Sequence, residues 1–189
     1  MKKLIMILFL TFIWFNLFSQ TKYDSLLFEK INEYRVSKGL NELIWDNDLF
    51  KASEHHSNYL VNLNKIPNDT VYENNDMWIL LGHAENKNVR GIKKLKSPTD
   101  RTKYYLKGDV FVGENVFFAS ILKMNEFIVD QILKNWISSK LHNEFLLNEN
   151  IKYGSNSIIE YEYYYVNSFN TLVTDIDNIN IYVTFNGYW

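Results

Sequence analysis

Apolar residues recur at helical spacing in three segments of the chain, and this pattern predicts three helices. We expect them over residues 24–39, 46–67 and about 125–139, with Gly39 and Pro67 placed to end the first two. The apolar stripes consist of Leu27, Ile31 and Tyr34; of Leu49, Ala52, His56, either Tyr59 or Leu60, and Leu63; and of Val129, Ile132, Leu133 and Trp136. Because His56 lies on its stripe and His55 does not, His56 is expected in the core, satisfied by a hydrogen bond.

Strand-like patterns dominate the second half of the chain. β-branched and aromatic residues predict a short buried strand over residues 116–118 and longer strands over 153–166 and 179–185, with residues 175–178 as a break. Periodicity fades over residues 68–112, so we expect a long ordered loop there that carries His83. His142 is expected just past the end of the third helix, where its side chain can turn toward a cleft.

The first 20 residues have the pattern of a secretory signal peptide. Lys2 and Lys3 precede an apolar run from Leu4 to Phe18, which at about fifteen residues is short for a helix that spans a bilayer. A retained amino-terminal anchor is the alternative. We therefore expect cleavage near residue 20, a single domain over residues 21–189 without a transmembrane helix, and a secreted or periplasmic location.

Composition narrows the classes of protein that this chain can belong to. A net charge of -2, with no sustained basic stripe, argues against nucleic acid as the main partner. The one basic cluster is expected to be a solvated loop; it consists of Arg90, Lys93, Lys94, Lys96, Arg101 and Lys103. The absence of cysteine excludes both disulfides and a lipoprotein anchor, so the core alone must hold the domain.

His83, Glu114 and His142 are the strongest candidates for chemistry. Two imidazoles and a carboxylate can hold a divalent metal ion or move a proton near neutral pH. Glu114, within Gly113-Glu114-Asn115, can equally brace a turn by accepting backbone N–H groups. Glu85 is a further acid near His83, and is expected to be a solvated loop residue. Ser138 and Ser139 lack the context of a serine nucleophile, since no Gly-x-Ser-x-Gly turn accompanies them.

The order and spacing of several motifs resemble the CAP superfamily, also called the SCP domain, and in particular its bacterial secreted branch. The matching positions are Ile31-Asn32-Glu33-Tyr34-Arg35 with Gly39-Leu40, Leu43-Ile44-Trp45-Asp46, Ala52 with His56-Ser57, Gly82-His83, Ser97-Pro98-Thr99-Asp100-Arg101, Gly113-Glu114-Asn115-Val116, and Trp136, Ser138, His142 and Gly154. Each motif is weak alone, but together they cover nearly the whole mature chain.

The resemblance implies an α+β fold, a three-layer α-β-α sandwich around a central, largely antiparallel sheet. It also implies a cleft in which His83, His142 and Glu114 bind zinc or another divalent cation. The second acid of the family cleft is missing, because Ser139 stands in its place. A metal site here would therefore be open, with water completing the coordination shell.

Three functions follow as hypotheses. The first is an extracytoplasmic binding or interaction module whose cleft takes a divalent metal or a small ligand. The second is a metal-dependent, peptidase-like hydrolase that uses the same cleft, with Glu114 as base or ligand. The third is lipid or sterol binding, which the aromatic content of 16% leaves open without indicating a cavity.

Overall fold

The computed structural model describes residues 20–64, 82–85, 93–166 and 172–189. Along the chain these residues form α1 (Lys22–Ser37), β1 (Ile44–Trp45), α2 (Asn47–Asn64), α4 (Pro98–Leu106), β2 (Val112–Ile121), α5 (Glu126–Ser138), α6 (Lys140–Leu146), β3 (Tyr153–Val166) and β4 (Leu172–Tyr188). Residues 1–19 of the expected signal peptide lie outside these ranges, and so does Pro67. Within them, no helix is long and apolar enough to cross a membrane.

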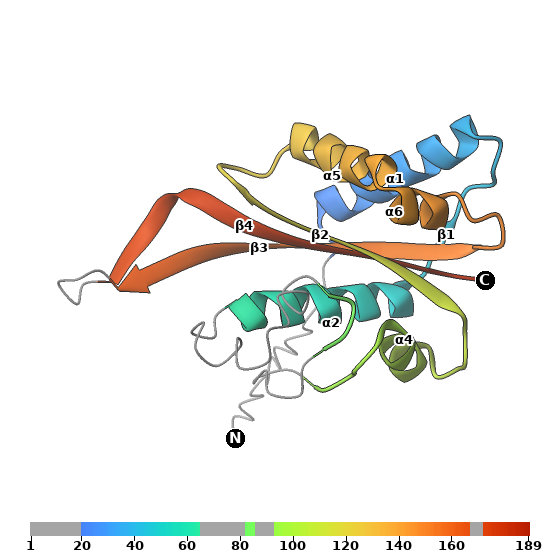
Figure 1. The fold of residues 1–189 in the computed structure, drawn as a ribbon, viewed down its shortest axis with the longest axis horizontal. Helices are drawn as coiled ribbons and strands as arrows, with labels where there is room; N and C mark the ends of the chain where they lie inside the picture. The colour runs from blue at the N-terminus through green and yellow to red at the C-terminus, as the bar shows by residue number, and fades with distance from the viewer. Residues whose placement is uncertain (1–19, 65–81, 86–92, 167–171) are drawn as a thin grey trace, which may run out of the picture.

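One four-stranded sheet, in the order β1-β3-β4-β2, forms the middle layer. β1 runs parallel to β3, whereas β4 is antiparallel to both β3 and β2. Helices α1, α5 and α6 lie on one side of the sheet, and α2 and α4 lie on the other (Figure 1). The prediction of an α+β sandwich with a largely antiparallel sheet is therefore confirmed.

The core has two parts, one on each side of the sheet. The larger part packs α1 and α5 against the sheet, with Leu27, Ile132 and Trp136 fully buried in it. The smaller part lies under α2, where Tyr59 and Leu60 meet Tyr182 of β4. The apolar stripes of the helices contribute to both parts. Because burial of apolar side chains drives this packing, the buried helix faces can be predicted from the sequence.

Four expectations about local structure need correction. Residues 98–106 of the expected loop form α4, and the strand expected over 116–118 extends over the whole of β2. His142 lies inside α6 instead of past a helix end. Residues 175–178 belong to β4, although the register between β3 and β4 shifts there, between Glu162 and Tyr164.

Candidate functional site

The site is built around β2, the strand at one edge of the sheet. Successive side chains of a strand point to opposite faces. Glu114 accordingly reaches Arg101 of α4, whereas the side-chain amide of Asn115 donates to the main-chain oxygen of His142 in α6, at 3.2 Å. β2 thus connects the helical layers on both sides of the sheet at the position of the Gly113-Glu114-Asn115 motif.

Gly113 allows α6 to pack closely on β2. A Cβ atom at this position would overlap the ring of Phe145, so a side chain is incompatible with the present packing. The ring of Phe145 in turn contacts Phe185 of β4, with centroids 5.5 Å apart. The glycine therefore fixes the position of α6, and with it the position of His142, relative to Glu114.

Glu114 is buried and held by a fork of hydrogen bonds. Nη2 of Arg101 donates to both carboxylate oxygens, at 2.8 and 2.7 Å, and Nδ1 of His83 lies 3.0 Å from Oε1. The side chain of Glu114 is only 1% exposed, whereas that of His83 is 47% exposed. Because an ionised carboxylate can only accept hydrogen bonds, the proton of a neutral His83 ring lies on Nδ1 in this arrangement, and Nε2 then carries the lone pair.

Arg101 joins Glu114 to a second buried carboxylate, that of Glu85. Nη1 of Arg101 donates to Oε1 of Glu85 at 3.1 Å. Two imidazoles of α2 also contact this carboxylate: Nε2 of His55 at 3.2 Å and Nδ1 of His56 at 3.1 Å. All four side chains are at most 6% exposed, so this network of charged groups is paired inside the protein instead of being solvated.

The first turn of α4 explains why Arg101 points inward. Ser97 caps the helix by accepting from the backbone N–H of Asp100, and the Asp100 carboxylate accepts from the backbone N–H of Ser97. Pro98 occupies the start of the helix, where its missing N–H is harmless. This reciprocal capping box fixes the beginning of α4, and Arg101 follows directly.

The pKa of both carboxylates of the network is lowered from its ordinary value. Burial alone would raise the pKa of Glu114 from 4.5, but the charges of His56 and Arg101 and the hydrogen bonds from His83 and Arg101 outweigh it and hold the pKa at about 2. Burial likewise opposes ionisation of Glu85, yet hydrogen bonds from His55 and His56 and the charge of Arg101 lower its pKa.

The lowered pKa of Glu114 predicts a loss of stability in acid. A carboxylate with a depressed folded-state pKa stabilises the fold above its unfolded pKa, and this contribution is lost as the pH falls from 4.5 toward 2. Between pH 7 and pH 3, wild-type protein should lose about 2 kcal/mol more free energy of unfolding than Glu114→Gln, as measured by urea titration at each pH.

Titrating groups remote from Glu114 cancel in this comparison. Asp24, whose pKa burial raises to about 6, has the opposite sign, since its contribution is lost as the pH rises, but both proteins carry it. Glu29→Gln, which removes an exposed carboxyl of α1, should follow the wild-type curve. Parallel curves for wild type and Glu114→Gln would show that Glu114 does not titrate with folding.

His142 completes the histidine pair from the other side of β2. Its Nδ1 atom is buried and has no hydrogen-bond partner in the part of the chain that the structure describes. Burial lowers the pKa of His142 first, and the charge of nearby His83 lowers it further, so the neutral ring is favoured. The residue as a whole is only partly buried, and a neutral imidazole whose ring nitrogen lacks a protein partner is suited to bind a ligand.

The structure brings His83 and Glu114 into direct contact, and His142 lies near enough to His83 for the charge of His83 to lower the pKa of His142. Across the described ranges, no group of three or more histidine, cysteine, aspartate or glutamate side chains is arranged to hold a metal ion. Both oxygens of Glu114 are already engaged by Arg101. Among the described residues, the two imidazoles are therefore the part of the predicted trio with ring nitrogens that lack a protein partner.

The residues that support the site differ in part from the expectations based on the sequence. Arg101 and Glu85 were expected in solvated loops, but both are buried and paired. The prediction of a buried, hydrogen-bonded His56 is confirmed, since its Nε2 also lies 3.1 Å from the carbonyl oxygen of Gly82. His55 is buried too, with Nδ1 at 3.0 Å from the hydroxyl of Tyr105. The capping box at Ser97 was the sequence signal that could have placed Arg101 on a helix.

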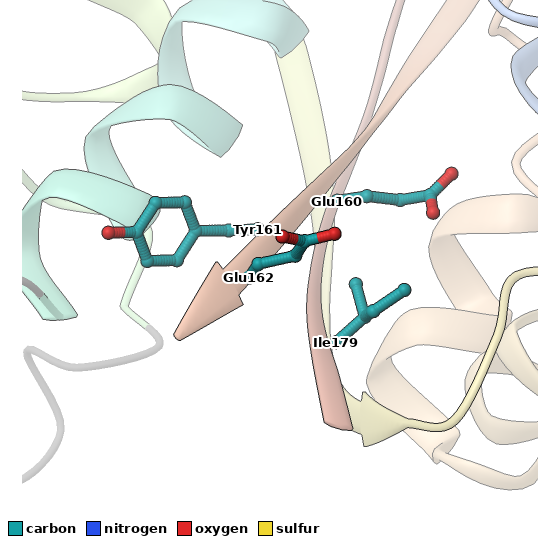
Figure 2. A pocket seen from close by; sticks show the side chains of 4 residues that line it. All are labelled: Glu160, Tyr161, Glu162 and Ile179. Atoms are coloured by element: carbon teal, nitrogen blue, oxygen red, sulfur yellow. The ribbon is translucent and has the colours of Figure 1, made fainter. Parts of the chain in front are cut away.

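A pocket of about 350 Å³ lies away from these histidines. Its lining consists of Glu160, Tyr161, Glu162 and Ile179, at the place where β3 and β4 extend past β2. Figure 2 shows Tyr161 pointing toward the side of α2, whereas Glu160 points to the opposite side of the sheet. None of the residues predicted for the site contributes to this pocket.

With this fold and site in hand, comparison with known proteins gives the family. The model of the cysteine-rich secretory protein family, CAP, matches residues 28–173. The chain therefore belongs to the CAP family. The three-layer sandwich is consistent with this family. The resemblance inferred from the motifs is confirmed.

Among solved structures, the fold is similar to an outer surface protein from Borrelia burgdorferi, with a TM-score of 0.51, 20% identity, and coverage of 89% of this chain and 95% of that one. It is also similar to an extracellular protein containing a SCP domain from Bacillus anthracis, with a TM-score of 0.52 and 17% identity; 88% of this chain aligns with 40% of that protein. No curated protein matches the chain.

Proposed function

We propose that this CAP protein is an extracytoplasmic binding module whose cleft holds a divalent cation or a small ligand between His83 and His142. The observation that carries the proposal is the pair of available nitrogen atoms. Glu114 engages Nδ1 of His83 and leaves Nε2 free, while Nδ1 of His142 is buried without a partner among the described residues. The extracytoplasmic location rests on the signal-peptide pattern and on the extracellular Bacillus anthracis protein that shares the fold.

The donor set fits zinc bound through nitrogen. Metal-binding histidines usually donate their other ring N–H to a carboxylate, which orients the ring and raises its basicity. Glu114 occupies this supporting position toward His83. The two imidazoles would hold the cation, and water would complete an open coordination shell. When bound, the cation would supply a positive charge that attracts an anionic ligand group into the cleft.

The alternative of a hydrolase with Glu114 as general base receives less support. A general base works best with a pKa near the working pH, and the pKa of Glu114 lies at about 2. Both of its oxygens also accept from Arg101. The geometry thus favours Glu114 as a fixed support for His83 over a role in proton transfer.

Calorimetric titration of the purified protein with zinc tests the proposal. Wild-type protein should bind zinc saturably, and the His83→Asn/His142→Ala double variant should bind at least about tenfold more weakly. Asparagine suits position 83 because its side-chain amide can still donate to Glu114, as Nδ1 of His83 does, but it offers no second ring nitrogen.

Ser138→Ala serves as the matched control. Ser138 is exposed near the end of α5, its hydroxyl donates to the carbonyl oxygen of Asn135, and it is close to His142 in sequence without belonging to the site. Its zinc isotherm should match that of wild type. Absence of zinc binding by wild-type protein, or equal binding by the double variant, contradicts a cation site at these histidines.

A further inference from the structure

We infer that Arg101 is a positioning residue, which fixes His83 of the proposed cleft in one place and in one tautomer. The inference deepens the proposed function, because it concerns the same histidine pair. Nη2 of Arg101 acts on His83 directly and indirectly: it donates to the main-chain oxygen of His83 at 3.0 Å, and it donates to the carboxylate of Glu114 that engages the His83 ring. One guanidinium group thus holds both the backbone and, through Glu114, the side chain of His83.

The other terminal nitrogen of Arg101 is also held by hydrogen bonds. Its Nη1 donates to Glu85 at 3.1 Å and to the carbonyl oxygen of Leu95 at 3.4 Å. Glu85 is held in turn by His55 and His56, which α2 projects from the layer that packs on the sheet. The chain of contacts therefore runs from the rigid helix α2 through Glu85 and Arg101 to Glu114 and His83.

The exposure of these groups explains why His83 needs such support. His83 is nearly half exposed and lies in a segment without helix or strand, so its own surroundings restrict the ring little. Arg101 and Glu114, by contrast, are almost fully buried. An exposed neutral histidine exchanges between its two tautomers, but an anionic acceptor fixed beside Nδ1 favours the form protonated at Nδ1. The buried network thereby keeps the Nε2 lone pair presented to the cleft.

A lysine at position 101 separates this role from that of a positive charge alone. Lysine keeps the charge, but its single nitrogen cannot reproduce the planar fork that spans Glu85 and Glu114. Long-range ¹H–¹⁵N spectra of the metal-free protein, recorded at about pH 8 where histidine is neutral, report the tautomer of His83 directly. Wild type should show the form protonated at Nδ1, and Arg101→Lys should show a mixture together with about tenfold weaker zinc binding.

Val129→Ala is the control for a general loss of stability. Val129 is fully buried on α5, on the other side of the sheet from Arg101, so its truncation should destabilise the protein while the tautomer of His83 stays as in wild type. If Arg101→Lys retains the wild-type tautomer, or if Val129→Ala changes it equally, Arg101 does not position His83.

A second measurement covers the case in which Arg101→Lys fails to fold. In wild-type protein, the two Nη groups of Arg101 should give separate ¹⁵N signals, because different partners hold each of them. A single averaged signal would refute the fixed fork. The readout also separates this inference from the proposed function: wild type that binds no zinc but shows the Arg101-dependent tautomer would leave the positioning role intact and remove the cation site.

Discussion

Arg101→Met is expected to lower the free energy of unfolding by about 3–5 kcal/mol. Methionine fills much of the same volume but leaves Glu85 and Glu114, both nearly inaccessible to water, without their shared cation. Removing one partner of a buried ion pair costs far more than removing a surface charge, because the carboxylates left behind lose their shared cation and are not solvated. Urea unfolding at neutral pH, followed by circular dichroism, measures the loss.

Lys103→Met provides the comparison on the same helix. Lys103 pairs with Asp109, but both side chains are largely exposed, at 61% and 81%. Such surface pairs contribute little, so the free energy of unfolding should change far less than in Arg101→Met. If Arg101→Met were as mild as Lys103→Met, the network around Glu85 and Glu114 would not be a stabilising part of the fold.

The contrast between α4 and the other long helices shows what the sequence pattern can and cannot predict. α1, α2 and α5 bury apolar stripes, so their hydrophobic periodicity predicted them to within a few residues. α4 buries a guanidinium and a threonine, Arg101 and Thr102, which no scale of hydrophobicity ranks as core residues. Its burial depends on two glutamates distant in sequence, and such pairing can be seen only once the chain has folded.

The same reasoning applies to the site. The motif positions identified His83, Glu114 and His142, and the structure places His83 and Glu114 in contact. The supporting residues Glu85 and Arg101 looked like solvated loop residues, because local sequence reports charge but not the partner that neutralises it. Long-range contacts across 30 positions, such as that between His55 and Glu85, leave no periodic trace in the sequence.

The strands of the sheet were predicted in part. The content of β-branched and aromatic residues predicted β3 and the last part of β4, in which Ile181 and Val183 point into the main core. The full length of β2 was missed because its first half carries Gly113, Glu114 and Asn115, which are weak strand formers. Pairing with β4 overrides this local preference, for instance between Gly113 and Gly187.

Trp136→Ala is expected to lower the free energy of unfolding by about 3–5 kcal/mol, through loss of packing. Trp136 of α5 is fully buried and is the largest such side chain in the described residues; it packs against Phe185 with ring centroids 6.2 Å apart. Its Nε1–H also donates to the carbonyl oxygen of Val116 at 3.1 Å, which ties α5 to β2 two residues beyond Glu114. Thermal and urea unfolding measure the total cost.

Trp136→Phe separates the hydrogen bond from the packing. Phenylalanine keeps most of the apolar contact with Phe185 but cannot donate to Val116, so this variant should lose about 1–3 kcal/mol, less than Trp136→Ala. Because α5 leads directly into α6, the loosened contact with β2 should also weaken the placement of His142. Val129→Ala is the control, because it truncates a core residue of the same helix that makes no hydrogen bond to β2. Trp136→Phe should therefore weaken zinc binding more than Val129→Ala does. Equal binding by the two variants would show that the Trp136 hydrogen bond stabilises the fold without shaping the cleft.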